Sequence, residues 1–284
     1  MNFFALQDQA RSNTRKLVFL FGAAVLTLIL ITSALVVGLI FYAEQQEMGL
    51  TTDFLTSTIF LQVSLVVIAV VGLGTLYRLG QLRGGGKTVA EAMGGRLLNT
   101  ITRDADERKI LNVVEEMAIA SGTPVPQVYL MEEESINAFA AGYRPRDAVI
   151  GITRGCIREL SRDELQGVVA HEFSHIFNGD MRLNIRLIGL LYGIMVIGLI
   201  GYHMLRGGRY SGSSRSGKKG GGGIVMLGLG LMVVGYGGTF FGNMIKSAVS
   251  RQREYLADAT AVQFTRNPEG IGGALKKIGG YTAG

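Results

Sequence analysis

Cysteine and proline are scarce in this 284-residue sequence, which has one cysteine and four prolines, and only 18% of its residues are charged. The single cysteine, Cys156, cannot form an internal disulfide or a thiolate zinc cage, so we expect a small buried apolar residue at that position. Hydrophobic residues make up 48% of the chain, a balance that excludes disordered, collagen-like and coiled-coil proteins. The composition therefore favours a membrane protein with a smaller water-facing part.

The charge is moderately basic, with 28 lysines and arginines against 22 acidic residues and a formal net charge of +6. Basic proteins often bind nucleic acid, but the basic residues of this chain cluster beside its apolar runs, where they would meet lipid headgroups. We therefore expect a lipid bilayer, and no nucleic acid, among the partners.

Two charge-free apolar runs, 17–43 and 54–77, are each longer than the roughly 20 residues that a helix needs to cross a bilayer. Basic residues precede the first run and follow the second, whereas the turn between them carries Glu44, Glu47 and Asp53. The positive-inside rule then places both ends of this hairpin in the cytoplasm.

Two shorter, glycine-rich apolar stretches follow at Leu187–Leu205 and Ile224–Ile245. The connection between them is basic, with Arg206, Arg209 and Lys218 among glycines and serines, which is unusual for a loop on the far side of a membrane. Either both stretches cross and the loop is exported against its charge, or they form a shallow or protein-buried hairpin. We favour crossing.

Glycines in the last stretch recur at helical spacing on one face and permit close helix packing (Gly228, Gly235, Gly238 and Gly242). The spacing does not say whether the packing partner is the same chain or a second copy, so a homo-oligomer is one of two interpretations.

The remaining segments are water-facing, and helical spacing predicts a helix over Asp106–Ser121. Short β-like runs at Val128–Met131 and Ala148–Thr153 predict two strands, and Ser135–Ala140 is a candidate edge strand. A small sheet beside helices indicates an α+β fold. The expected organisation is an N-terminal cytoplasmic tail, a transmembrane hairpin, a soluble domain, a second membrane hairpin and a continuation of the soluble domain (1–16, 17–77, 78–186, 187–245 and 246–284).

The clearest chemical motif is HEFSH at 171–175. Ser161 and Glu164 have capping-box spacing and open a run, 165–178, that should be a helix. Residues four apart lie on one helix face, so both imidazoles can bind one zinc ion while Glu172 reaches a water on the metal. A solvated surface helix is the alternative, but apolar neighbours indicate burial, which favours a hydrolytic zinc site (Val168, Val169, Ile176 and Phe177).

A catalytic zinc ion usually has three protein ligands, so a third is required. His203 ends an apolar stretch that leads away from the motif and is disfavoured. Glu254 and Asp258 are better placed, because one carboxylate could bind zinc while the other accepts the free N–H of a ligating histidine. Spacing alone gives equal weight to two solvated carboxylates that pair with Arg251 or Arg253.

The segments that carry these motifs, ELQGVVAHEFSHIFNGD from Glu164 and SRQREYLADA from Ser250, resemble the HtpX-type membrane zinc metalloproteases, which are relatives of the CAAX prenyl endopeptidases. The similarity runs from about residue 88 to 275. The resemblance implies a gluzincin-like metalloprotease domain that holds one zinc ion per chain through His171, His175 and Glu254.

The same resemblance implies that Glu172 is the general base and that Asp258 and Asp180 support the ligands. The segments SINAFAAG and VIGITRG resemble the family's edge strand and the strand before its active-site helix. Substrate backbone could pair with this edge, giving cleavage of extended segments with loose side-chain preference, and an ordinary covered strand is an equal alternative (Asn137, Ala138, Phe139 and Ala140). Three side chains are candidates for stabilising the oxyanion (Arg251, Arg253 and Tyr255).

The function implied by the resemblance is proteolytic quality control, in which a prokaryotic plasma (inner) membrane enzyme with a cytoplasmic catalytic domain cleaves misfolded or damaged membrane proteins. The alternatives are a processing peptidase with one defined substrate and a non-catalytic zinc-binding membrane scaffold, against which the intact Glu172 argues. Family members usually continue beyond the point that matches Gly284, so we expect a truncated or unusually short chain.

Overall fold

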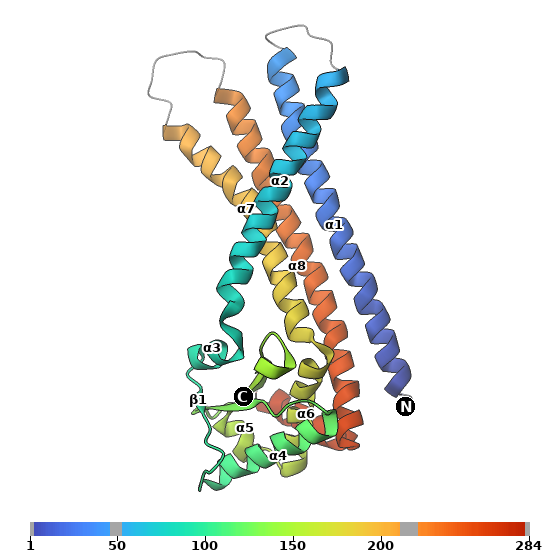
Figure 1. The fold of residues 1–284 in the computed structure, drawn as a ribbon, viewed down its shortest axis with the longest axis vertical. Coiled ribbons are helices and arrows are strands. Elements are labelled where there is room, and N and C mark those ends of the chain that lie inside the picture. The colour runs from blue at the N-terminus through green and yellow to red at the C-terminus, as the bar shows by residue number, and fades with distance from the viewer. Residues whose placement is uncertain (1–2, 46–52, 211–220, 282–284) are drawn as a thin grey trace. The chain divides into compact units, whose positions relative to one another are not determined.

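The computed structural model describes residues 3–45, 53–210 and 221–281 (Figure 1). The chain divides into two compact units. The sheet unit contains Met1–Arg15, Leu82–Ile185 and Val249–Gly284, and the helical unit contains Lys16–Gln81 and Arg186–Ala248. The predicted α+β class is confirmed, because the described part is mostly helical and has a small mixed sheet.

The helical unit is built from parts of four long helices, α1 (Phe3–Gln45), α2 (Asp53–Gln81), α7 (Asp180–Tyr210) and α8 (Gly221–Thr265). Among the described residues, four segments are long and apolar enough to cross a membrane, as the sequence predicts (Gln7–Phe41, Thr58–Ala92, Asp180–Gly207 and Gly223–Thr265). Helix α8 continues well past the predicted end of its apolar stretch at Ile245, because residues 246–265 contain neither glycine nor proline.

The glycines of α8 pack against helices of the same chain. A Cβ added at Gly235 would overlap backbone atoms of Gly198 in α7, and one added at Gly201 would lie 2.5 Å from the carbonyl oxygen of Gly228. The other two predicted glycines face different partners, Gly238 approaching Leu28 of α1 and Gly242 approaching Leu191 of α7. The glycine face therefore serves packing within the chain.

The sheet unit carries a four-stranded sheet in its described part, with strand order β1-β2-β4-β3. Its strands are β1 (Arg96–Leu97), β2 (Gln127–Met131), β3 (Ala138–Ala141) and β4 (Val149–Thr153). β2 and β4 are parallel, and the other two pairings are antiparallel. Every residue of β4 is buried, as expected for a strand that is covered on both faces.

The predicted edge strand lies at the edge of the sheet, but its bounds differ. β3 begins at Ala138, so Asn137, which we expected to pair with substrate, precedes it. The backbone N–H of Asn137 donates to the hydroxyl of Thr153 at 3.0 Å, and its carbonyl accepts from the backbone N–H of Thr153. The strand thus begins directly after the residue that is bonded to Thr153, the last residue of β4. β1 is two residues long, too short for a pattern to predict.

Helices cover the sheet and build the core. They are α3 (Gly85–Ala92), α4 (Ala105–Ser121), α5 (Arg154–Glu159), α6 (Arg162–Asn178) and α9 (Pro268–Tyr281), with short 3-10 turns at Leu82–Gly84 and Pro145–Asp147. α6 lies centrally, in contact with α4, α9 and β3. Cys156 is buried in this core as predicted, and burial raises the pKa of its thiol to about 12.

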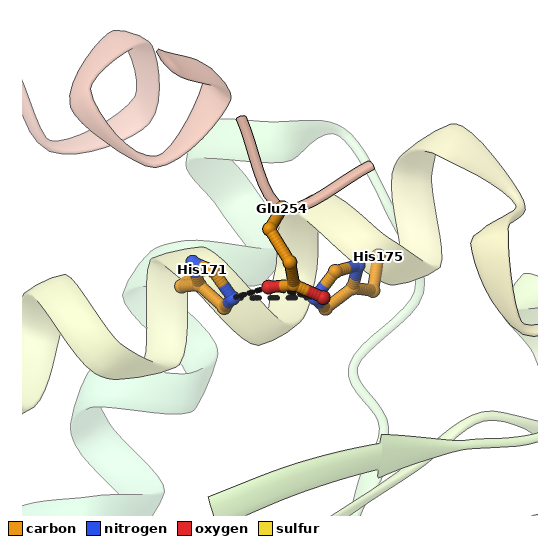
Figure 2. A group of neighbouring side chains, drawn as sticks. All are labelled: His171, His175 and Glu254. Atoms are coloured by element: carbon orange, nitrogen blue, oxygen red, sulfur yellow. Dashed lines mark hydrogen bonds and ion pairs between the residues drawn. The ribbon is translucent and has the colours of Figure 1, made fainter. Parts of the chain in front are cut away.

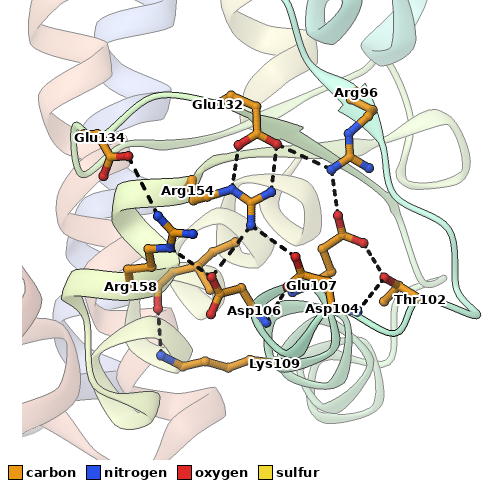
Figure 3. Close-up of polar contacts among 11 residues, drawn as sticks. Arg96, Thr102, Asp104, Asp106, Glu107, Lys109, Glu132, Glu134, Arg154 and Arg158 are labelled. Carbon is orange, nitrogen blue, oxygen red and sulfur yellow. Dashed lines mark hydrogen bonds and ion pairs between the residues drawn. The ribbon is translucent and has the colours of Figure 1, made fainter.

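Charged side chains join β2, α4 and α5 on the surface of the sheet unit (Figure 3). Arg154 donates to both carboxylate oxygens of Glu132, at 2.5 and 2.8 Å. These hydrogen bonds hold the pKa of Glu132 well below its usual range, at about 2. Arg154 lies where β4 passes into α5, so the network fixes the corner that leads into α6.

Candidate metal centre

The helix that carries the histidine motif, α6, has the predicted capping box. The hydroxyl of Ser161 accepts from the backbone N–H of Glu164, whose carboxylate accepts from the backbone N–H of Ser161 at 2.7 Å. The helix ends at Gly179, which has a φ of 71° and so adopts the left-handed conformation that glycine tolerates. The prediction of a helix over this run is confirmed.

One face of α6 is buried in the core, where Val169, Phe173 and Ile176 are at most 1% exposed. Val168 is buried as well, but Phe177, which we expected to be buried, is 49% exposed and packs edge-on against Phe264 of α8. The apolar neighbours therefore fix the orientation of the helix.

His171 and His175 lie one helical turn apart, with their Nε2 atoms 3.2 Å from each other and their rings nearly perpendicular (Figure 2). Glu254 reaches the same point from α8. Its Oε2 atom lies 3.2 Å from Nε2 of His171 and 3.8 Å from Nε2 of His175. One ligand atom from each of these three residues falls within 4.8 Å of the others. The residues that the resemblance names as ligands therefore converge.

Two aspartates stand behind the histidines. Nδ1 of His171 lies 3.0 Å from Oδ1 of Asp258, and Nδ1 of His175 lies 2.8 Å from Oδ2 of Asp180. If each Nδ1–H donates to its aspartate, both Nε2 atoms present lone pairs to the carboxylate of Glu254. Three acceptors that face one another in this way repel unless a cation lies between them.

The spacing of this donor set fits a zinc ion. Tetrahedral coordination at about 2.0–2.1 Å separates neighbouring ligand atoms by roughly 3.3 Å. Two of the three separations among His171, His175 and Glu254 are 3.2 Å and the third is 3.8 Å. The residues present therefore fit a zinc ion with one position open.

The electrostatics also favour positive charge at this point. Burial lowers the pKa of His171, but hydrogen bonds to Asp258 and Glu254 and the charge of Glu172 outweigh it and raise that pKa to about 10. The groups around His171 therefore favour a cation at this point.

Glu172 is buried beside the ligands, with only 9% of its surface exposed. Burial raises the pKa of its carboxyl, while the charges of His171 and His175 and a hydrogen bond from the backbone N–H of Ala140 act in the opposite direction. A carboxyl with a raised pKa beside a metal site is suited to taking up and returning a proton. The bond to Ala140 also connects this side chain to the edge strand β3.

The other candidates have different surroundings. His203 belongs to α7 in the helical unit, where its ring contacts Tyr202. Arg253, a candidate for oxyanion stabilisation, lies instead 2.8 Å from Asp180. Tyr255 is 58% exposed. The sequence does not indicate the contact between Arg253 and Asp180, because 73 positions separate the two and no spacing rule connects them.

A cavity of about 550 Å³ lies next to Asp258, the aspartate that contacts His171. The N-terminal part of α1, the last turns of α8, and α9 form its walls, and Tyr255 and Asp258 are among its lining residues. Asp258 is accordingly 45% exposed, in contrast to Asp180 at 9%.

Comparisons with known proteins place the chain in a family. The model of peptidase family M48 matches residues 104–278, a range that includes both histidines, Glu172 and Glu254. The protease HtpX homologue of Dictyoglomus turgidum is 42% identical over 169 residues, which are 60% of this chain and 53% of that protein. The homologue of Thermoanaerobacter pseudethanolicus is 42% identical over 188 residues, 65% of this chain and 62% of the relative. The homologue of Streptococcus uberis is 36% identical over 215 residues, 75% of this chain and 70% of the relative. The chain spans less than two thirds of the length of the first two relatives.

Proposed function

The chain belongs to peptidase family M48, and from that premise we propose that it is a membrane zinc endopeptidase that cleaves misfolded or damaged membrane proteins. The observation that carries the proposal is the convergence of His171, His175 and Glu254 within 4.8 Å, with Glu172 buried beside them. The similarity to protease HtpX homologues from bacteria supports it.

In the proposed site, His171 and His175 bind one zinc ion through Nε2, and Glu254 binds it through its carboxylate. Asp258 and Asp180 accept the Nδ1–H groups and so hold each imidazole in the tautomer that binds metal. When bound, zinc lowers the pKa of a coordinated water toward about 7 and polarises the carbonyl of the peptide bond that is cut.

Glu172 is the proposed general base. It takes a proton from the attacking water and later returns that proton to the leaving amine. The raised pKa of its carboxyl, caused by burial, makes the carboxylate a stronger base toward the attacking water than a solvated glutamate would be. The hydrogen bond from the N–H of Ala140 orients the carboxylate relative to β3.

We propose that the substrate backbone lies along β3, which pairs only with β4 among the described residues. Addition of a strand recognises main-chain groups, so it favours extended, unfolded segments and makes little use of side chains. This mode suits a quality-control protease. Ala138, Phe139 and Ala140 lie within β3, and Asn137 lies at its entrance.

The proposed location is a prokaryotic plasma membrane, with the metal centre on the cytoplasmic side. Basic residues at both ends of the first hairpin support this orientation (Arg11, Arg15, Lys16, Arg78 and Arg83). In this arrangement the metalloprotease domain, 78–186 and 246–284, is interrupted by the second membrane hairpin, 187–245.

The test is cleavage of an unfolded protein by the detergent-purified chain, with zinc measured on the same sample. We expect about one zinc ion per chain and activity that disappears with a chelator and returns with zinc. Glu172→Gln should retain zinc and cleave at least about 100-fold more slowly, because it cannot accept a proton. Glu115→Gln, which alters an exposed glutamate of α4, is the matched control and should cleave at the normal rate.

Two results would reject the proposal. Bound zinc without cleavage by the unaltered chain would favour a non-catalytic zinc-binding scaffold. Cleavage of a single defined sequence, with unfolded proteins left intact, would favour a processing peptidase.

A further inference from the structure

The two histidines of the metal centre differ in the support behind them. His171 relies on Asp258, whose side chain is 45% exposed beside the cavity described above. His175 relies on Asp180, whose side chain is only 9% exposed. An ionised carboxylate at such a buried position requires a compensating charge.

Arg253 supplies that charge. Its Nε atom lies 2.8 Å from Oδ1 of Asp180, while the other carboxylate oxygen, Oδ2, lies 2.8 Å from Nδ1 of His175. The Nε–H of Arg253 is not aligned for a hydrogen bond, so the contact with Asp180 acts mainly through charge. The side chain of Arg253 is itself only 17% exposed, which limits screening of the pair by water.

Arg253 contacts the two parts of the chain that supply the ligands, α8 and the end of α6. It immediately precedes the ligand Glu254 in α8, and its Nη2 atom lies 3.5 Å from the carbonyl oxygen of Asn178, the last residue of α6. Asp180, its ion-pair partner, begins α7. The same side chain therefore holds α8 against the end of the helix that carries both histidines.

We propose that Arg253 is a positioning residue of the metal centre, which holds the carboxylate of Asp180 in the orientation in which it fixes the ring of His175 for metal binding. The inference rests on the proposed zinc site and deepens it. It also gives Arg253 a role other than oxyanion stabilisation, because its guanidinium is engaged with Asp180 behind His175.

The physical consequence lies in metal affinity. Without the arginine, the side chain of Asp180 would be free to turn away, and His175 would lose the acceptor that orders its ring and keeps Nε2 free. Loss of such an outer partner typically weakens metal binding by about 10- to 100-fold. Lysine at position 253 would restore the charge but not the planar fork of the guanidinium, so partial recovery is expected.

The experiment compares zinc affinity of the full chain in detergent, measured by competition with a chelator, for the unaltered protein, Arg253→Met and Arg253→Lys. We expect Arg253→Met to bind zinc about 10- to 100-fold more weakly and Arg253→Lys to lie between the two. Arg108→Met, which removes an exposed arginine of α4, is the matched control and should bind zinc normally.

A second readout separates positioning from general stability. The visible spectrum of the Co²⁺-loaded protein depends on coordination geometry, so it should change in Arg253→Met and move back in Arg253→Lys. Asp180→Asn should weaken zinc binding as well. The double variant Asp180→Asn with Arg253→Met should lose no more zinc affinity than the single variant with the larger loss, because the two residues act as one unit.

The outcomes are distinct. Normal zinc affinity and an unchanged Co²⁺ spectrum in Arg253→Met would overturn the inference and leave the proposed function intact. Losses that simply add in the double variant would also overturn it. If the unaltered chain binds no zinc, the proposed function itself fails, and this inference fails with it.

Discussion

One buried hydroxyl, that of Thr153, organises the entrance to the edge strand. Its Oγ1 atom lies 2.5 Å from the carbonyl oxygen of Ser135 and 3.0 Å from that of Asn137, and it accepts the backbone N–H of Asn137. The same hydroxyl caps α5 by accepting from the backbone N–H of Cys156. Because Thr153 and Cys156 are both fully buried, the backbone N–H of Cys156 has no water to replace this hydroxyl.

We predict that Thr153→Val destabilises the protein by about 1–3 kcal/mol, because it leaves the buried backbone N–H of Cys156 without a partner. Loss of the hydroxyl should also displace the residues that precede β3. If β3 binds substrate, KM should rise several-fold while kcat changes less. Thr153→Ser keeps the hydroxyl and should resemble the unaltered chain in both respects. Thermal unfolding and steady-state cleavage of an unfolded protein would measure these effects, and an equal KM in all three proteins would argue against a role of β3 in substrate binding.

At the scale of elements, the packing of α9 against α6 depends on glycines at close approaches. A Cβ added at Gly167 of α6 would lie 2.6 Å from the backbone nitrogen of Ile271, and one at Gly270 would lie 2.6 Å from the carbonyl oxygen of Asp163. Lys277 of α9 also donates to the carboxylate of Glu164, the residue that closes the capping box of α6. The helix that carries the histidines is thus held against α9 at backbone contact distance.

We predict that Gly167→Ala costs about 1–3 kcal/mol of stability despite the higher helix propensity of alanine, because the added methyl group must displace α9. Gly272→Ala in α9 is the matched control, since a Cβ at that position meets no atom within 4 Å. The control should be neutral or slightly stabilised. The difference between the two unfolding temperatures in detergent is the measurement, and similar temperatures would show that α9 moves aside without cost.

Local patterns predicted the elements that have local causes. The capping box at Ser161 and the helical spacing after it predicted α6, and the long apolar runs predicted the four long helices. The start of β3 was wrong because its cause, the hydroxyl of Thr153, lies 15 positions beyond Ala138. The bounds of an element that depend on contacts distant in the sequence could not be predicted from a local pattern.

At the scale of the whole molecule, the same distinction applies to the metal centre. His171 and His175 follow from helical spacing, whereas spacing left Glu254 undecided between a ligand and a solvated carboxylate. The resemblance to known proteases supplied its role, and the structure brings its carboxylate within 3.2 Å of His171. The pair of Arg253 and Asp180 depends on how α8 meets the end of α6, which neither spacing nor the resemblance indicated.

Packing of the apolar helices shows what composition leaves open. Glycines on one face of α8 predicted a close helical partner without identifying it, and backbone contacts with α7 at Gly198 and Gly201 now identify one in the same chain. A bilayer offers little hydrophobic drive for helices to associate, so such contacts depend on shape and on the absence of side chains.

We therefore predict that Gly235→Val disrupts the crossing of α7 and α8, because a Cβ at this position would overlap the backbone of Gly198. The expected cost is about 1–3 kcal/mol, as for other overpacked interiors. Gly237→Val, two positions away in the same helix, is the matched control, since a Cβ there meets no atom within 4 Å. Both variants add the same apolar side chain, so a change in hydrophobicity or in helix propensity would affect them equally. A lower unfolding temperature in detergent for Gly235→Val alone would establish that backbone contact between α7 and α8 stabilises the chain, whereas equal temperatures would mean that this contact contributes little.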